Sequence, residues 1–215
     1  MKKLLIITDS LGLPRNTPEF VNYEETWVHK LKDFFNVYYV CLGGATIKDL
    51  YQQIEYSKMF NADFVVIQSG IVDCAPRALT KFENELFNKF WITRTFLDYW
   101  LNGKKLKYLR QKRNVSYTKI KVFEYYINEI KKAFEDKLFW IEILNSGIEY
   151  EKKLPGIIEN VEKYNSIIKN VIGLNNFIEI SKIPQSGIMT DNIHLNTQGH
   201  EYLFNKVFNK LNEKQ

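Results

Sequence analysis

The segment Leu4-Leu5-Ile6-Ile7-Thr8-Asp9-Ser10-Leu11-Gly12 decides the fold of this chain, because a short apolar run ends there in a polar turn. Four consecutive large aliphatic residues are typical of a parallel strand that is covered on both faces. The turn then places a carboxylate and a hydroxyl at the carboxyl end of that strand. Open parallel sheets bind ligands at that edge, so we expect the chemistry of the protein there.

The same alternation of strand and helix continues along the chain. Further strands are predicted at Val37–Leu42, Phe64–Ile67, Leu138–Leu144 and Phe177–Ile180. Helical periodicity is found at Thr26–Phe35, Ile47–Phe60, Phe82–Trp100, Ile120–Phe134, Pro155–Val171 and Thr197–Leu211. This order predicts an α/β fold, with a mostly parallel sheet and helices on both sides.

The length of 215 residues and the absence of a Pro/Gly/Ser-rich linker indicate one domain over residues 1–215. The long connection between the third and fourth strands predicts a helical, basic insertion at about 78–135. Two cysteines do not make a disulfide framework. The apolar run at the start is too short for a signal peptide, and no stretch reaches the ~20 apolar residues of a membrane span, so we expect a soluble, cytoplasmic protein.

Two glycine-containing turns follow the second and third strands. Gly44 lies in Leu42-Gly43-Gly44-Ala45-Thr46, where an unobstructed backbone N–H could meet a ligand or simply form a tight turn. The third strand is followed by Gln68-Ser69-Gly70-Ile71-Val72-Asp73-Cys74-Ala75-Pro76-Arg77. Asp73 and Arg77 are charged groups at the edge where a site is expected, although either could be an ordinary solvated loop residue.

The most specific motif is Asp191-Asn192-Ile193-His194. An Asp and a His three residues apart in a turn allow the carboxylate to hold one imidazole nitrogen, which leaves the other as a base for a hydroxyl nucleophile. A metal site formed by Asp191, His194 and His200 is the alternative, but the spacing fits no usual zinc pattern, so we predict no metal or other cofactor.

Taken together, the four motifs resemble the four blocks of the SGNH (GDSL-like) hydrolases. Thr8-Asp9-Ser10-Leu11 is similar to the Gly-Asp-Ser-Leu block, and the segment from Asp191 to His194 matches the closing Asp-x-x-His block. The resemblance implies a three-layer α/β/α sandwich with a five-stranded parallel sheet. It also implies Ser10 as nucleophile, Asp191 and His194 as its partners, and Gly44 as an oxyanion donor.

The third block departs from the family pattern of Gly-x-Asn-Asp, because Val72 stands where the oxyanion-binding Asn is expected. Loss of one such donor costs on the order of 10²–10³ in rate. We predict that Arg77 points into the cleft near Ser10, either to complete the oxyanion hole or to bind an anionic group of the substrate. We place Asp9, Gly70 and Asp73 with Gly44 among the oxyanion- or substrate-binding residues.

The resemblance implies a serine esterase that removes a short acyl group, possibly O-acetyl, from a carbohydrate or another small molecule. An acyltransferase with the same triad, acting in surface-polysaccharide biosynthesis, and a non-catalytic binding protein are the alternatives. The basic segment Lys104–Lys121 could contact an anionic substrate or a membrane surface, or be a solvated face. It carries no nucleic-acid-binding motif, so binding to nucleic acid is not expected. The sequence leaves the acyl and alcohol portions of the substrate open.

Overall fold

The computed structural model describes residues 1–89, 103–113, 115–145 and 147–214. Within these ranges the strands form one parallel sheet in the order β2-β1-β3-β4-β5. Their bounds are β1 (Lys3–Thr8), β2 (Asn36–Cys41), β3 (Phe64–Gln68), β4 (Leu138–Ile141) and β5 (Phe177–Ile178). The predicted five-stranded parallel sheet is therefore confirmed.

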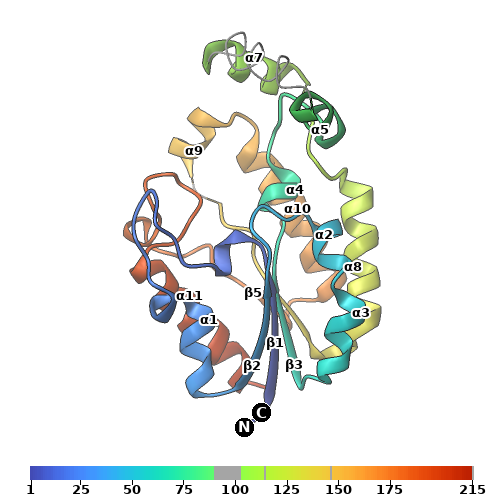
Figure 1. The fold of residues 1–215 in the computed structure, drawn as a ribbon, viewed down its shortest axis with the longest axis vertical. Coiled ribbons are helices and arrows are strands. Elements are labelled where there is room, and N and C mark those ends of the chain that lie inside the picture. Colours follow the sequence, from blue (N-terminus) through green and yellow to red (C-terminus); the bar gives the residue numbers. More distant parts are fainter. Residues whose placement is uncertain (90–102, 114, 146, 215) are drawn as a thin grey trace.

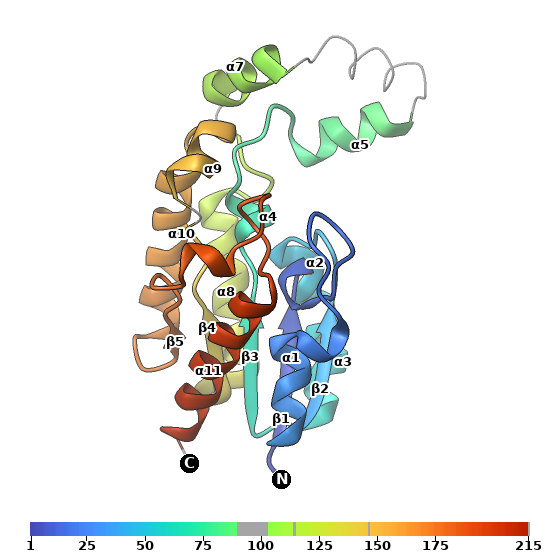
Figure 2. The ribbon, with the colours of Figure 1, turned by 90° about the vertical axis from the view of Figure 1, so that its left-hand side faces the viewer.

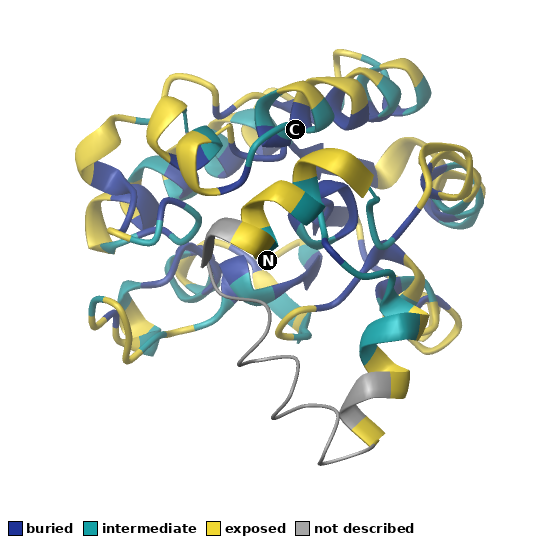
Figure 3. Cartoon of the chain, turned by 90° about the horizontal axis from the view of Figure 1, so that it is seen from above, coloured by how far each residue is buried: buried dark blue, intermediate teal, exposed yellow. Residues whose placement is uncertain are grey.

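Helices cover both faces of the sheet (Figure 1). One face carries α2 (Ile47–Tyr51), α3 (Ile54–Ser57), α8 (Ile120–Phe134) and α10 (Ile157–Ile172), and the other carries α1 (Trp27–Lys30) and α11 (Thr197–Asn212). Side chains alternate along a strand, so Leu5 and Ile7 join the first of these cores while Leu4 and Ile6 join the second. Seen from above, the buried residues lie between the helical layers (Figure 3).

The fourth and fifth strands end earlier than predicted because side chains take over the backbone hydrogen bonds. Asn165 of α10 accepts from the N–H of Ile143 at 2.8 Å and donates to its carbonyl at 2.9 Å. Glu142 accepts from the backbone N–H groups of Ile180 and Ser181, each at 2.8 Å. These side chains satisfy the backbone groups beyond the strand ends without a further strand pair.

Two predicted helices are broken into shorter pieces. The segment predicted at Thr26–Phe35 contains α1 followed by a 3-10 turn at Leu31–Asp33, and the segment predicted at Ile47–Phe60 contains α2, α3 and a 3-10 turn at Lys58–Phe60. Asn61 ends the latter segment in the left-handed region, with φ of 45°. By contrast, α8 and α11 lie close to their predicted bounds.

The chain between β3 and β4 contains α4 (Ile71–Cys74), α5 (Lys81–Lys89), α7 (Gly103–Arg113) and α8. α8 buries Phe123, Ile127 and Ile130 in the sandwich, so this part of the predicted insertion belongs to the helical layer. Among the described helices of that insertion, α5 and α7 lie beyond the carboxyl edge of the sheet (Figure 2). The remainder of the helix predicted at Phe82–Trp100, from residue 90, and the side chain of Lys104 lie outside the described residues.

A short helix, α9 (Ile148–Lys153), lies between β4 and α10 at the same end of the molecule (Figure 2). None of the described helices has the length and apolarity required to cross a bilayer.

Candidate active site

Ser10, His194 and Asp191 form a continuous chain of polar contacts at the carboxyl edge of the sheet. The Ser10 Oγ lies 3.1 Å from Nε2 of His194. Nδ1 on the opposite side of the ring lies 2.6 Å from Oδ2 of Asp191. These distances are within the reach required of a nucleophile, a base and a group that orients the base.

The turn from Asp191 to His194 is held by its own backbone. Oδ1 of Asp191 accepts hydrogen bonds from the backbone N–H groups of Ile193, at 2.9 Å, and His194, at 3.0 Å. Asn192 takes a left-handed conformation with φ of 65°. Asn196 then caps α11 by accepting from the N–H groups of Gln198 and Gly199. One carboxylate therefore fixes both the loop and the imidazole ring.

The site favours an ionised Asp191 beside a neutral His194. Burial raises the pKa of Asp191, but the hydrogen bonds from the backbone and ring of His194 and from the Ile193 backbone lower it by more, so the net shift is downward. Burial lowers the pKa of His194, and the hydrogen bond and charge of Asp191 offset only part of that effect. At neutral pH the imidazole is thus available as a base.

Asp9 lies behind the nucleophile and is fully buried, with no exposed surface. Its Oδ1 accepts from the N–H of Leu11 at 3.0 Å, which caps the 3-10 turn Ser10–Gly12. Burial raises the pKa of Asp9 to about 7, although the Leu11 hydrogen bond lowers it. We expected Asp9 among the substrate-binding residues, but burial removes it from contact with a substrate and gives it the role of shaping the Ser10 turn.

Two backbone N–H groups at the carboxyl edge of the sheet have no protein acceptor in the part of the chain that the structure describes. Among the described residues, neither Ser10 nor Gly44 donates its N–H to another protein group. Gly44 is exposed and has φ of 70°, a conformation that glycine adopts at little cost. The site thus offers two unpaired donors at the edge where Ser10 lies.

Asp73 lies beneath the Gly44 loop, again with no exposed surface. Its two carboxylate oxygens accept from the N–H of Ile47, the first residue of α2, at 3.1 and 3.0 Å, and Thr118 donates its hydroxyl to Oδ1. Burial raises the pKa of Asp73 to about 7 against these hydrogen bonds, and the charge of Asp9 adds to the increase. Asp73 was also expected to contact substrate, but it instead anchors α2, the helix that follows the Gly44 loop.

Gly70 is a packing residue in this structure. It is buried with φ of 131°, and a Cβ atom there would lie 2.3 Å from Cδ1 of Ile143. Val72 packs against the same core that lines this face of the sheet. The expected substrate contact of Gly70 is therefore replaced by a close approach to the chain after β4.

Arg77 contacts the chain that follows α7. The guanidinium carbon of Arg77 lies 4.6 Å from the centre of the Tyr117 ring. The backbone N–H of Arg77 donates to the carbonyl of Val115 at 2.7 Å. Within the described part of the chain, Arg77 forms no hydrogen bond with Ser10 or His194. The cation whose charge acts on His194 is Arg15. Both roles predicted for Arg77, completing the oxyanion hole and binding an anionic group of the substrate, stay predictions.

A loop that flanks the triad was not predicted from the sequence. Residues 13–22 fold back on themselves through paired backbone hydrogen bonds between Arg15 and Val21. Glu19 of this loop accepts from the N–H of Thr190 at 2.9 Å, next to Asp191. The connection runs between segments 171 positions apart, so no local pattern could indicate it.

His200 does not form a metal-binding cluster with Asp191 and His194. It is buried on α11, and its Nδ1 accepts from the N–H of Trp27 at 3.4 Å. Burial lowers its pKa to about 4. No cluster of three or more potential metal-ligating side chains occurs among the residues that the structure describes.

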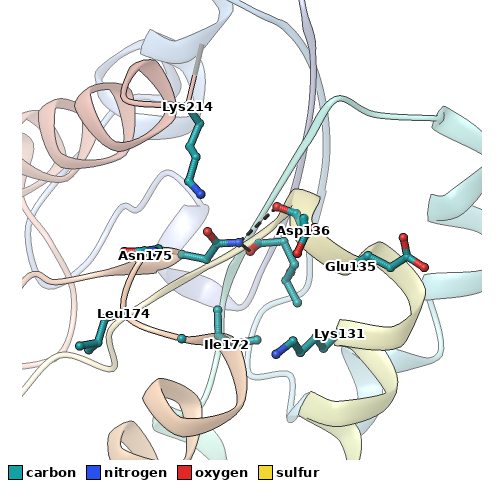
Figure 4. A pocket seen from close by; sticks show the side chains of 10 residues that line it. Lys131, Glu135, Asp136, Ile172, Leu174, Asn175 and Lys214 are labelled. Atoms are coloured by element: carbon teal, nitrogen blue, oxygen red, sulfur yellow. Dashed lines mark hydrogen bonds between the residues drawn. The ribbon is translucent and has the colours of Figure 1, made fainter.

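A cavity of about 510 Å³ lies at the opposite, amino edge of the sheet (Figure 4). Asn176 lines it and donates from Nδ2 to the carbonyls of Asp136 at 3.2 Å and Leu138 at 2.8 Å. Lys131 and Lys214 also line it. No residue predicted to act in catalysis or binding lies there, so the candidate site remains the carboxyl edge.

No protein-family profile matches the sequence, and no curated protein matches it either. Solved structures are similar over nearly the whole chain. A lipase/acylhydrolase from Enterococcus faecalis is 14% identical with a TM-score of 0.68, over 100% of this chain and 97% of that one. A GDSL-like lipase from Bacteroides thetaiotaomicron is 11% identical with a TM-score of 0.63, over 100% and 89%. An acetyl xylan esterase from Geobacillus stearothermophilus is 13% identical with a TM-score of 0.59, over 97% and 94%.

The fold is thus that of the GDSL-like, or SGNH, lipases and acylhydrolases, as the sequence resemblance implied.

Proposed function

We propose that this protein is a serine esterase that hydrolyses a short acyl ester, with Ser10 as nucleophile. The observation that carries the proposal is the unbroken chain from Ser10 Oγ to His194 Nε2, at 3.1 Å, and from His194 Nδ1 to Asp191, at 2.6 Å. That this arrangement occurs on the fold of known acylhydrolases supports it.

In the proposed reaction, His194 takes the proton of Ser10 as the oxygen attacks the ester carbonyl. The N–H groups of Ser10 and Gly44 bind the oxyanion of the tetrahedral intermediate. The proton then passes from His194 to the departing alcohol, leaving an acyl group on Ser10. A water molecule, deprotonated by His194, attacks this acyl-enzyme and releases the acid. Asp191 keeps the imidazole in the required tautomer throughout.

An O-acetyl group on a carbohydrate is the substrate class that we propose. Acetyl xylan esterases are among the proteins with this fold, which supports a short acyl group on a sugar. Val72 supplies no side-chain donor for the oxyanion, so we expect slower turnover than a three-donor site would give, by on the order of 10²–10³.

Labelling with a fluorophosphonate probe tests the nucleophile. The wild-type protein should label at one serine. Both Ser10→Ala and His194→Ala should abolish labelling. Each variant protein should still unfold at the same urea concentration as wild type, which shows that its fold is intact. Ser166→Ala removes an exposed serine on α10 and is the matched control, with labelling unchanged. Labelling that survives Ser10→Ala would refute the proposal.

Product analysis with an acetylated sugar then tests hydrolysis. Release of free acetate at the same rate with and without added sugar acceptor supports an esterase. Acetate that appears only on the acceptor would make the protein an acyltransferase instead.

A further inference from the structure

Two arginines that the proposed catalysis leaves unused lie on segments that are joined at the carboxyl edge of the sheet. Arg77 follows α4, and Arg110 lies on α7. α7 is tied to the chain just after Arg77, because Arg113 donates to the carbonyl of Ala78 at 2.8 Å and Val115 pairs with the Arg77 backbone. In both ribbon views α7 lies beyond α9 at this end of the molecule (Figure 1 and Figure 2).

Neither arginine has a carboxylate partner among the described residues. Both Nε atoms are buried without a hydrogen-bond partner. Arg113, three positions further along α7, shows the ordinary alternative, with two guanidinium nitrogens on Glu83 at 3.0 and 2.8 Å. Arg77 instead has the face of Tyr117 at 4.6 Å, a contact that orients the guanidinium without neutralising its charge.

The positive charges of Arg77 and Arg110 repel each other. Burial lowers the pKa of Arg110, and the positive charge of Arg77 lowers it further. Two partly buried guanidinium groups without a counter-ion are unfavourable unless a negative group comes to lie between them. Planar guanidinium groups bind carboxylate and phosphate oxygens in pairs, which makes such oxyanions the best-matched ligands.

Tyr150 is within electrostatic range of both arginines and of Asp191. It is buried on α9, and burial raises its pKa to about 12. The charges of Arg77 and Arg110 act on its hydroxyl in one direction, and the charge of Asp191 acts in the other. Lys153 of the same helix donates to the carbonyl of Thr190, immediately before Asp191. The arginine pair therefore belongs to the surroundings of the site.

We propose that Arg77 and Arg110 form a subsite for an oxyanion of the substrate, a carboxylate or a phosphate, while the ester of the same molecule occupies Ser10. This inference rests on the proposed esterase function and makes the substrate an acidic sugar ester. Both arginines are specificity-determining residues here, and the reacting atoms remain those of the triad and the ester.

Binding to the Ser10→Ala protein separates this inference from catalysis, because the ester stays intact. Titration calorimetry at constant ionic strength compares three O-acetylated methyl glycosides, namely the glucuronide, the glucoside 6-phosphate and the uncharged glucoside. Hydrogen bonds to charged groups correspond to about 10- to 100-fold in affinity. We expect at least one of the two anionic esters to bind more tightly than the glucoside by such a factor, and the stronger of them identifies the oxyanion.

Arg77→Gln and Arg110→Gln should each remove most of that preference. Arg110 lies on a partly exposed helix, so its variant tests the subsite even if loss of the Arg77 contact with Tyr117 impairs folding. Lys107→Gln removes an exposed positive charge from α7 and is the matched control, with the preference retained.

Equal binding of charged and uncharged esters would overturn the subsite. The subsite would also be overturned if the preference for anionic esters survived Arg110→Gln, or if Lys107→Gln weakened it as much as Arg110→Gln does. Such a preference would reflect the general positive charge of α7. Failure of fluorophosphonate labelling in the wild-type protein would refute the esterase proposal alone, since the binding comparison does not depend on turnover.

Discussion

Replacing Asp9 by Asn tests the electrostatics behind the nucleophile. The carboxyl group is completely buried, its Oδ2 has no hydrogen-bond partner, and burial raises its pKa from 3.8 to about 7. Asn has nearly the same shape and can keep the hydrogen bond from Leu11 through its carbonyl oxygen, but it cannot ionise. The substitution therefore isolates the contribution of one buried ionisation to stability.

The size of the effect follows from the pKa values of the two states. The folded state retains the proton where the unfolded chain has lost it, so the stabilisation is complete below pH 3.8 and is lost as the pH rises to about 7. The rise of the Asp9 pKa from 3.8 to about 7 corresponds to at most about 4 kcal/mol. Asn abolishes this pH dependence and adds a buried amide NH₂ without a partner, which costs about 1–3 kcal/mol at every pH.

Urea unfolding of both proteins between pH 4.5 and pH 8 measures this difference. At pH 4.5 we expect Asp9→Asn to be less stable than wild type, and at pH 8 to equal or exceed it. Asp73 titrates in both proteins, so its contribution largely cancels in the comparison. Asp33→Asn, which removes an exposed carboxylate, is the control for loss of one negative charge. Parallel stability curves for Asp9→Asn and wild type would refute the reasoning.

Two further outcomes are expected. kcat/KM for ester hydrolysis should rise with pH through a midpoint below 6.5, because burial lowers the pKa of His194 and the base must be neutral. Asp191→Asn should move this midpoint lower still and reduce the rate on the plateau. A wild-type midpoint above 7 would contradict the assignment of His194 as the base. Gly70→Ala should cost about 2–5 kcal/mol of unfolding free energy, because its Cβ meets Ile143 and its φ of 131° is strained. Adding Ile143→Ala should recover the steric part, whereas strictly additive losses in urea unfolding would show that the two residues do not clash.

The sequence indicates the sheet and its layers well, because buried parallel strands and amphipathic helices have distinct apolar patterns. It misplaces the ends of β4 and β5, since the side chains of Asn165 and Glu142 replace strand hydrogen bonds from other parts of the chain. Side chains that replace strand hydrogen bonds in this way leave no periodic pattern in the sequence. Their partners are recognisable only once the helices and strands have packed.

The site shows the same division. Local motifs placed Ser10, Asp191 and His194 at the correct edge, and the structure brings them together. Asp9 and Asp73 were expected to face the substrate, because a carboxylate in a loop looks the same in sequence whether it is buried or exposed. Arg110 was noted only as part of a basic segment, since its proximity to Arg77 depends on how α7 folds over the sheet.

Ser10 and His194 are separated by 184 positions, and this has a consequence for the protein during its synthesis. At about 5–20 residues per second, the ribosome delivers the base roughly 10–40 s after the nucleophile. Until then Ser10 is an ordinary alcohol, because no imidazole accepts its proton. A nascent chain would therefore be inert towards the esters of the cell. Reaction of Ser10 with a fluorophosphonate would then mark the moment when the chain has completed its fold.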